Sequence, residues 1–211
     1  MHRVAAAIHA WRRSGARPGD NAAILGGTPL ALAMGAVALS AGSGRTALID
    51  DDSACRAALA EHRAAAVATP NDDAGWDELR SALGGFGPDV VFECSGTPRS
   101  RLAAVELSRP AGSVVLLASD EQRVPMDLNL LVMGDKRVRG ARGYAAAEAQ
   151  AALELMARSC IDTSALVGAS MEIDAFLVAA ADDALASGLS SCQTTIVRWP
   201  ADAQLPVTAQ S

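Results

Sequence analysis

The sequence has little of the residues on which several kinds of chemistry depend. Lys136 is the only lysine, so Schiff-base chemistry would rest on this single residue. Tyr144 is the only tyrosine and is followed four positions later by Glu148, which excludes the Tyr-x-x-x-Lys pair of short-chain dehydrogenases. The cysteines lie far apart, without C-x-x-C or other metal-ligand spacing, and this predicts a reduced protein. They are Cys55, Cys94, Cys160 and Cys192.

A basic surface and long apolar runs are also missing. The formal net charge is −6, whereas nucleic acids and anionic membranes require a basic face on their protein partners. No apolar run reaches the length of a membrane span without a charge or a cluster of glycines. The first stretch, "MHRVAAAIHAWRRSG", has too short an apolar run for a secretory signal. These features predict a cytoplasmic protein whose partners are neither nucleic acids nor membranes.

What the chain does contain is a regular alternation of apolar strands and helices. Of its 211 residues, 50% are hydrophobic, enough to bury one sizeable core. An amphipathic helix over residues 3–14 precedes a core over residues 22–143. The alternation predicts an α/β protein with a doubly wound parallel Rossmann sheet of about six strands and helices on both faces. The predicted strands are residues 21–27, 45–50, 64–69, 88–96, 112–119 and 136–143, and the helices between them are 29–42, 53–62, 76–85 and 99–110.

A shorter αβαβ extension follows this core over residues 144–200. Its pattern predicts helices over 145–160 and 174–188, the second with Asp174 as N-cap, and extended segments over 165–173 and 193–200. We therefore expect one Rossmann-like domain over residues 1–200, followed by a flexible tail over 201–211.

The turn after the first core strand, within "AAILGGTPLALAMG", has the pattern of a dinucleotide-binding turn. Such a turn uses three glycine positions, for the bend, for close approach of the pyrophosphate and for helix packing. Here the first is Gly26, the second is Thr28 and the third is an alanine. The branched Cβ of Thr28 would lie where the phosphate binds, although its hydroxyl could donate to that phosphate. Because Gly27 adds slack and the helix amides after Pro29, at Leu30 and beyond, attract anions, we expect a weakened cofactor site.

An acidic cluster ends the second core strand. Asp50 stands 24 positions after Gly26, near the place of the carboxylate that binds the adenosine ribose hydroxyls in dinucleotide folds. It could equally cap the predicted helix that follows. Since Asp50 opens a run of three aspartates, which would repel a 2′-phosphate, the cluster favours NAD over NADP.

Several segments, in their order along the chain, resemble one known family. They are "AAIHAWRRSGARPGDNAAILGGTPLALA", "PDVVFECSG", "RPAGSVVLLAS", "RVRGARG" and "LASGLSSCQTTIVRWP", and together they span nearly all of residues 5–200. The set is similar to the cofactor-binding domain of the medium-chain dehydrogenase/reductase family, the zinc alcohol dehydrogenase superfamily. Enzymes of this family carry a preceding GroES-like domain that supplies the zinc ligands, and this chain begins just before the cofactor domain.

The resemblance implies no catalytic residue and no metal site within this sequence. The histidines, His2, His9 and His62, are expected to be structural rather than zinc ligands. In the family, the segment at Cys94, Ser95 and Gly96 borders the cofactor. Cys94 is either a nucleophile or a packing residue, and we favour packing because no histidine is placed to activate it.

The resemblance also identifies weakened cofactor contacts. Ala118 and its neighbours stand where the family usually has a glycine near the nicotinamide. Gln193 and Thr194 replace a basic residue that commonly contacts the pyrophosphate. The expected cofactor-binding residues are therefore Gly26, Gly27, Thr28, Pro29, Leu30, Asp50, Cys94, Ser95, Gly96 and Ala118.

Two functions remain open from the sequence. The first is an NAD(H)-binding, alcohol-dehydrogenase-like oxidoreductase subunit without catalytic zinc, completed by a separate catalytic partner or by its own oligomer. The second is a non-catalytic pseudo-dehydrogenase that has lost the cofactor and serves assembly or binds another small molecule. A methyltransferase that uses S-adenosylmethionine fits the segments less well. The polar strand over residues 136–143 suits a sheet edge, so we expect a homodimer in which two such edges pair.

Overall fold

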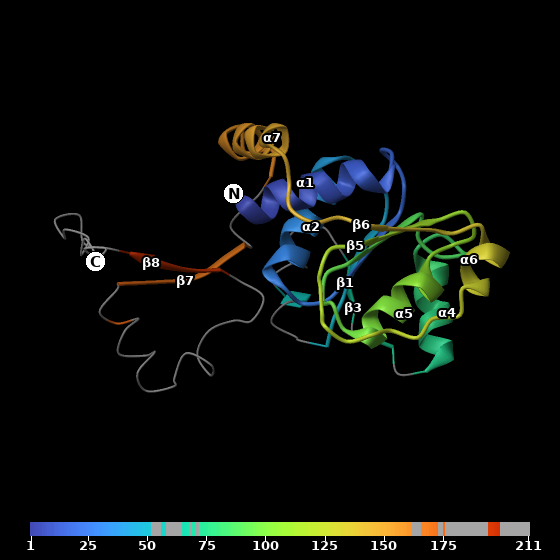
Figure 1. The fold of residues 1–211 in the computed structure, drawn as a ribbon. Helices are drawn as coiled ribbons and strands as arrows, with labels where there is room; N and C mark the ends of the chain where they lie inside the picture. Colours follow the sequence, from blue (N-terminus) through green and yellow to red (C-terminus); the bar gives the residue numbers. More distant parts are fainter. Residues whose placement is uncertain are drawn as a thin grey trace, which may run out of the picture.

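A computed structural model describes residues 1–51, 56–57, 65–67, 69–70, 72–161, 166–172, 175 and 194–198. Six parallel strands form one sheet in the order β3-β2-β1-β4-β5-β6 (Figure 1). This order confirms the predicted doubly wound sheet and places the switch point between β1 and β4. The strands are β1 (Ala22–Leu25), β2 (Thr46–Ile49), β3 (Ala65–Val67), β4 (Val90–Glu93), β5 (Ser113–Leu116) and β6 (Arg137–Gly140).

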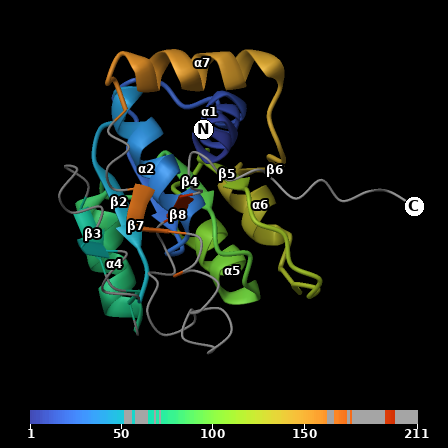
Figure 2. The ribbon, with the colours of Figure 1, turned by 90° about the vertical axis from the view of Figure 1, so that its left-hand side faces the viewer.

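Helices cover both faces of this sheet because alternate residues of each strand point to opposite sides. One face packs against α1 (His2–Ser14) and α2 (Pro29–Ser40), and α7 (Ala146–Ala157) lies across α1 on the outside of this layer (Figure 2). The other packs against α4 (Asp73–Ala82), α5 (Pro98–Leu107) and α6 (Asn129–Gly134). Phe92 of β4 belongs to the first core and Val91 to the second, and both are fully buried.

Three of the helices begin with residues that suit a helix N-terminus. The hydroxyl of Thr97 accepts from the amide of Ser100 at the start of α5, and Asp72 accepts from Gly75 at the start of α4. Proline follows the cap in α2 and α5, where its missing amide hydrogen costs nothing. In α1, Trp11 stacks on Phe92 with 6.0 Å between the ring centroids.

The structure corrects the sequence analysis at several boundaries. The helix predicted from residue 76 begins at Asp73, because Asp72 caps it, and the strand predicted over 112–119 ends at Leu116. The short helix α6 was not predicted. The helix predicted over 174–188, its cap Asp174 and the tail lie outside the described residues, as does most of the helix predicted over 53–62.

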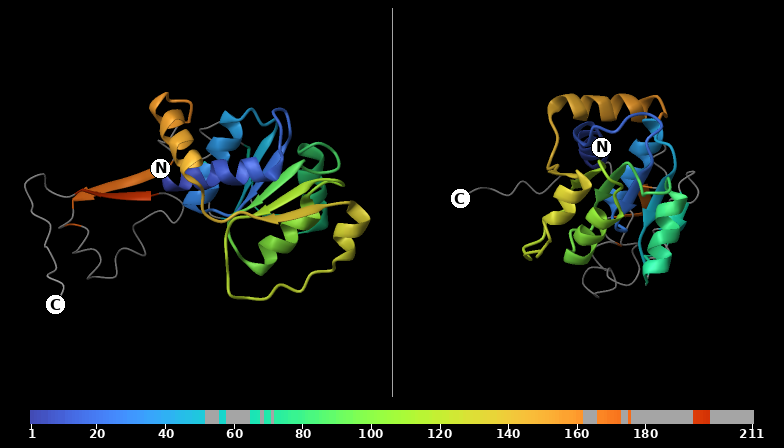
Figure 3. Two further views of the ribbon diagram at one scale, coloured as in Figure 1. Left: turned by 45° about the horizontal axis from the view of Figure 1, so that its top comes forward. Right: turned by 90° about the vertical axis from the view of Figure 1, so that its right-hand side faces the viewer.

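The predicted extension provides one more helix and two strands in the described part of the chain. Helix α7 confirms the pattern read at residues 145–160. The strands β7 (Val167–Glu172) and β8 (Thr194–Arg198) pair in parallel in a second sheet, which lies apart from the first (Figure 3). None of the helices in the described ranges is long and apolar enough to span a bilayer.

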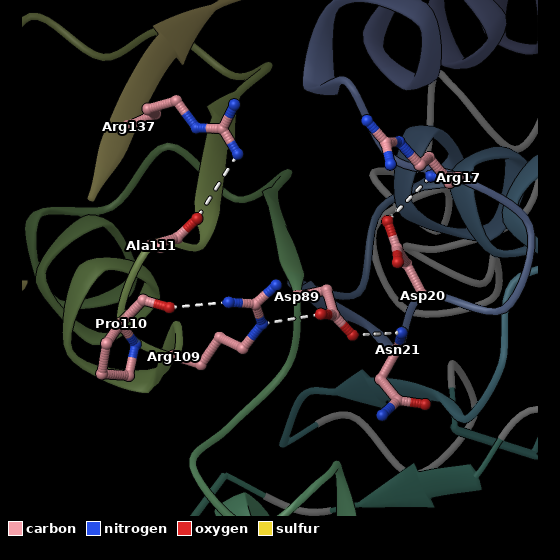
Figure 4. A network of polar contacts seen from close by, with 8 residues as sticks. All are labelled: Arg17, Asp20, Asn21, Asp89, Arg109, Pro110, Ala111 and Arg137. Carbon is pink, nitrogen blue, oxygen red and sulfur yellow. Dashed lines mark hydrogen bonds and ion pairs between the residues drawn. The ribbon is translucent and has the colours of Figure 1, made fainter. Parts of the chain in front are cut away.

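A polar network joins the amino ends of the central strands (Figure 4). Asp89, just before β4, accepts from the amide of Asn21 at 2.8 Å and from Nε of Arg109 at 2.6 Å. Arg109 also donates to the carbonyl oxygen of Pro110 at 2.7 Å. This network connects the segments before β1, β4 and β5 and so fixes the amino ends of these strands relative to one another.

Candidate functional site

A cavity of about 220 Å³ lies at the carboxyl ends of β1, β2 and β4. Three of the predicted cofactor-binding residues line it, namely Gly26, Asp50 and Ser95. Trp76 and Arg99 also line it, and the sequence analysis did not single them out. In open α/β sheets, ligands bind at the carboxyl ends of the strands beside the switch point, which is where this cavity lies.

Close packing between the turns after β1 and β4 requires glycine at position 26. Gly26 has a φ of 108°, and a Cβ there would lie 2.8 Å from Cβ and 2.9 Å from the amide nitrogen of Ser95. Gly96, with a φ of 84°, lies similarly close to the segment after β5, since its Cβ would be 3.2 Å from Cβ of Ala118. The turns that follow β1, β4 and β5 therefore contact one another.

The hydroxyl of Thr28 is used within the protein, which changes its expected role. Thr28 is the N-cap of α2, where its Oγ1 accepts from the amide of Ala31 at 3.1 Å and donates to the carbonyl oxygen of Cys94 at 3.3 Å. It therefore stabilises α2 rather than offering its proton to a phosphate. Because Pro29 has no amide hydrogen, Leu30 carries the first-turn amide left for an anion within the described residues.

Glu93, at the end of β4, organises the turn that follows, and the sequence analysis missed it. Its side chain is fully buried. Its Oε1 accepts from the amides of Ser95 and Gly96 at 2.9 and 2.8 Å, and from the hydroxyls of Ser95 and Ser100 at 2.8 and 2.6 Å. Its Oε2 is buried and has no hydrogen-bond partner among the described residues. A carboxylate that directly follows an apolar run and precedes the sequence Cys-Ser-Gly is the sequence feature that could have indicated this role.

The thiol of Cys94 is not poised as a nucleophile. Cys94 is buried, and its pKa is raised well above the ordinary range by burial and, to a smaller extent, by the adjacent charge of Glu93. A thiol that stays protonated attacks poorly, so the structure favours packing over catalysis at this position.

Asp50 directly follows the last residue of β2, at the carboxyl end of the strand, as expected from the sequence. Its backbone carbonyl accepts from Nη1 of Arg56 at 2.7 Å, and Asp50 is one of the residues that line the cavity. The neighbouring carboxylate of Asp51 accepts from the amide of Thr69 at 3.2 Å. The alternative role of Asp50 as a helix cap concerns residues outside the described ranges.

The remaining predicted positions lie beside this cavity or on a second one. Ala118 lines a larger cavity of about 630 Å³ between α5, the ends of β5 and β6, and the segment after β5. Six other positions line neither of the two cavities, although they lie in the segments after β1 and β4, including the start of α2, beside the first. They are Gly27, Thr28, Pro29, Leu30, Cys94 and Gly96. Gln193 is outside the described residues, and Thr194 is the first residue of β8.

Lys136, His2 and His9 each contact another group of the protein. Lys136 donates from Nζ to the carbonyl oxygen of Val105 at 2.6 Å, and its pKa is lowered by burial and then by Arg80. His2 hydrogen-bonds the hydroxyl of Tyr144, and His9 lies 3.7 Å from Glu148. No group of three or more His, Cys, Asp or Glu side chains gathers among these residues, so we derive no step through a metal.

The sheet order, the glycine turn and the crevice at the switch point define a Rossmann-type dinucleotide-binding fold. Residues 29–158, more than half of the chain, match the family model described as zinc-binding dehydrogenase. The chain therefore belongs to the zinc-binding dehydrogenase family, within the medium-chain dehydrogenase/reductase superfamily that the sequence resembled.

Known relatives share this domain over about half of their length. The chain is 31% identical over 159 residues to the 2-dehydro-3-deoxy-L-galactonate 5-dehydrogenase of Pseudoalteromonas atlantica, covering 75% of this chain and 46% of that protein. The solved structure of 2R,3R-butanediol dehydrogenase from Bacillus subtilis matches with a TM-score of 0.82 and 26% identity, over 93% of this chain and 56% of that one. A Sinorhizobium meliloti structure described as bound to NADP has the same fold, with a TM-score of 0.78 and 24% identity over 93% of this chain and 57% of that one. The chain spans about half the length of the curated relatives it matches.

Proposed function

We propose that this chain is the NAD(H)-binding part of an alcohol-dehydrogenase-like oxidoreductase whose catalytic groups come from another polypeptide segment or subunit. The observation that supports it is the cavity at the β1–β4 switch point, lined by Gly26, Asp50 and Ser95. When bound, a nicotinamide dinucleotide would supply the hydride acceptor or donor. The chain's own residues would bind and orient that cofactor.

Each residue of the crevice has a distinct part in this proposal. Asp50 would accept hydrogen bonds from the adenosine ribose hydroxyls, and Ser95 would border the adenosine. Gly26 would leave room for the turn, and the amide of Leu30 would donate to the pyrophosphate. Two aspartates but only one arginine, Arg99, line the cavity, and this charge favours NAD over the 2′-phosphate of NADP.

A non-catalytic function is the second candidate, and Thr28 is the observation that favours it. At the start of α2, the amide of Ala31 donates to Thr28 and Pro29 has no amide hydrogen. Fewer first-turn amides are therefore left to bind an anion than in a turn with three glycines. A chain that no longer binds a dinucleotide would serve assembly or hold another small molecule.

Titration of the purified chain with NADH, NADPH and S-adenosylmethionine separates these functions. Trp76 lines the cavity, so its fluorescence should report binding there, and a Trp76→Phe variant identifies the signal. Saturable NADH binding that is at least about tenfold tighter than NADPH binding is expected from the charge of the cavity. Silence from NADH would overturn the oxidoreductase proposal and select the non-catalytic one.

We also propose that two copies associate through β6. This strand forms an edge of the sheet, and the adjacent α6 segment exposes the apolar side chains of Leu128, Val132 and Met133. Light scattering should report twice the 21.5 kDa mass of one chain at micromolar concentration. A single-chain mass there would contradict this association.

A further inference from the structure

The larger cavity has the size and lining of a ligand pocket, but it is separate from the adenosine side of the crevice. Its volume of about 630 Å³ falls within the range of small-molecule sites. Apolar side chains from three different elements form much of its wall: Val105 of α5, Val138 of β6 and Met126 of the segment before α6. The two cavities have no lining residue in common.

Arg101 gives this apolar cavity a cationic group in which one buried N–H donor lacks an acceptor. It lies in the first turns of α5, lines the cavity and is partly buried. Its Nη2 donates to the carbonyl oxygen of Ala118 at 3.3 Å. Its Nε is buried and has no hydrogen-bond partner among the described residues. Since a guanidinium carries five N–H donors and burying an unpaired one is costly, the site is short of an anionic acceptor.

The other charged groups on the lining leave the net positive charge of the cavity unchanged. Arg142 and Asp120 both line it and are both exposed, so their charges offset each other near the solvent. Arg101 remains as the net charge, and it is the most buried of the three. An anion that enters would therefore meet an excess of positive charge at Arg101, the least exposed charged residue of the lining.

We propose that this cavity binds a small organic carboxylate, with its carboxylate on Arg101 and its hydrocarbon part against Val105, Met126 and Val138. The planar fork of a guanidinium matches a carboxylate, whose two oxygens can accept from adjacent N–H groups. The apolar wall then removes the hydrocarbon part from water. Because Ala118, one of the expected cofactor-binding residues, also lines this cavity, hexanoate binding is tested in the absence of NADH.

The test compares ligands that differ only in charge. Hexanoate is titrated against the purified chain by calorimetry and by amide chemical shifts, with hexanamide and hexylammonium as matched probes. Hexanoate should bind saturably with shifts confined to α5 and the segments that line the cavity, and hexanamide should bind at least about tenfold more weakly. Equal binding of acid and amide, or no saturation by hexanoate at about 10 mM, would overturn the proposal.

Two variants locate the site and one controls for charge. Arg101→Met should weaken hexanoate binding by about tenfold or more while leaving hexanamide unchanged. Val138→Phe fills the cavity without touching the charge, and it should weaken both ligands. Arg137→Met removes the same charge from an exposed residue at the opposite end of β6, so hexanoate affinity should not change. Retained affinity in Arg101→Met and Val138→Phe would show that hexanoate binds elsewhere.

Folding and NADH binding are measured on the same variants. Because Met keeps the apolar length of Arg101 and removes an unpartnered donor, the thermal midpoint of Arg101→Met should stay near that of the parent chain. If Arg101→Met fails to fold, Val138→Phe still decides, because it retains Arg101. NADH affinity is measured separately on both variants, and hexanoate is titrated without NADH, so a failure of the carboxylate site is distinguishable from a failure of the dinucleotide site.

Discussion

The two ends of the parallel sheet differ in how completely their charges are paired. At the amino ends, Asp89 and Arg109 form an ion pair and use further donors and acceptors of the segments before β1 and β5. At the carboxyl ends, Oε2 of Glu93 and Nε of Arg101 are buried without partners among the described residues, and both cavities open nearby. The unpartnered buried atom at the amino end, Oγ of Ser113, is uncharged, whereas both unpartnered charged groups of the described residues lie at the carboxyl end. Unsatisfied buried charges are costly, so this difference favours ligand binding at the carboxyl end.

The largest expected effect comes from the carboxyl end, at Gly26. Gly26→Ala places a Cβ 2.8 Å from Ser95 and forces a positive φ on an L-residue, so we expect a loss of about 3 kcal/mol in unfolding free energy and no NADH binding. Urea unfolding and the fluorescence titration measure these. Gly140→Ala is the control, because a Cβ there meets nothing within 4 Å, and it should be nearly neutral. A stable Gly26→Ala chain that binds NADH would contradict the packing argument.

At the amino end, a comparable change should affect stability alone. Asp89→Ala leaves the amide of Asn21 and the guanidinium of Arg109 without their acceptor, and we expect a loss of about 2 kcal/mol in unfolding free energy. NADH affinity at 25 °C should not change, since Asp89 lies at the far end of β4. Asp20→Ala, which removes a single exposed bond to the amide of Arg17, should cost less than about 1 kcal/mol. A changed NADH affinity in Asp89→Ala would break the division between the two ends.

Thr28 tests whether the turn is limited by its side chain. Thr28→Gly removes the branched Cβ and should tighten NADH binding. It should lower the free energy of unfolding by only a few tenths of a kcal/mol, because glycine is tolerated as an N-cap. Thr28→Ala also removes the hydroxyl but should cost about 1 kcal/mol, since alanine is a poor cap. Calorimetric titration with NADH measures binding by both variants, and urea unfolding measures their stability. Unchanged or weaker NADH binding in Thr28→Gly would count against steric hindrance at this position.

The smallest expected effect concerns a contact remote from both ends of the strands. The pKa of Glu148 is lowered from 4.5, first by the hydrogen bond from the amide of Ala145 and also by Arg12 of α1. A lowered folded-state pKa adds stability above pH 4.5 that is lost as the pH falls through the folded-state pKa. Glu148→Gln should therefore flatten the acid side of the stability profile slightly, measured by urea unfolding at successive pH values. An unaltered acid profile would show that this contact contributes nothing.

Periodicity was enough to predict the sheet, because β1, β4 and β5 are apolar strands separated by segments of helical length. It did not predict α6, whose six residues, "NLLVMG", are too short and too uniformly apolar to show a helical pattern. Gly26 and Asp50, named from the glycine-turn pattern, and Ser95, named from the family resemblance, line one cavity because the carboxyl ends of parallel strands meet at one edge. Their roles toward a cofactor stay predictions.

The residues that sequence patterns could not interpret have hydrogen-bond partners or burial that depend on segments brought together by the fold. Thr28 fits both a glycine-turn defect and a helix cap, and only the position of Cys94 shows where its hydroxyl donates. Arg101 lies on a helix where an arginine is usually solvated, so its buried nitrogen is visible only once the segment after β5 covers it. Glu93 was passed over for the same reason, because the donors to its carboxylate come from the next turn and from α5.

Helices α2 and α5 begin with the same two residues, threonine followed by proline, on neighbouring strands of the sheet. In each, the hydroxyl holds the third amide and the proline ring fixes the first φ angle, so neither first turn can unwind cheaply. The two helix starts beside the crevice are thus restrained in the same way before any ligand binds. Association there should carry a small conformational entropy cost, and a liganded crystal should superimpose closely on a ligand-free one at these two turns.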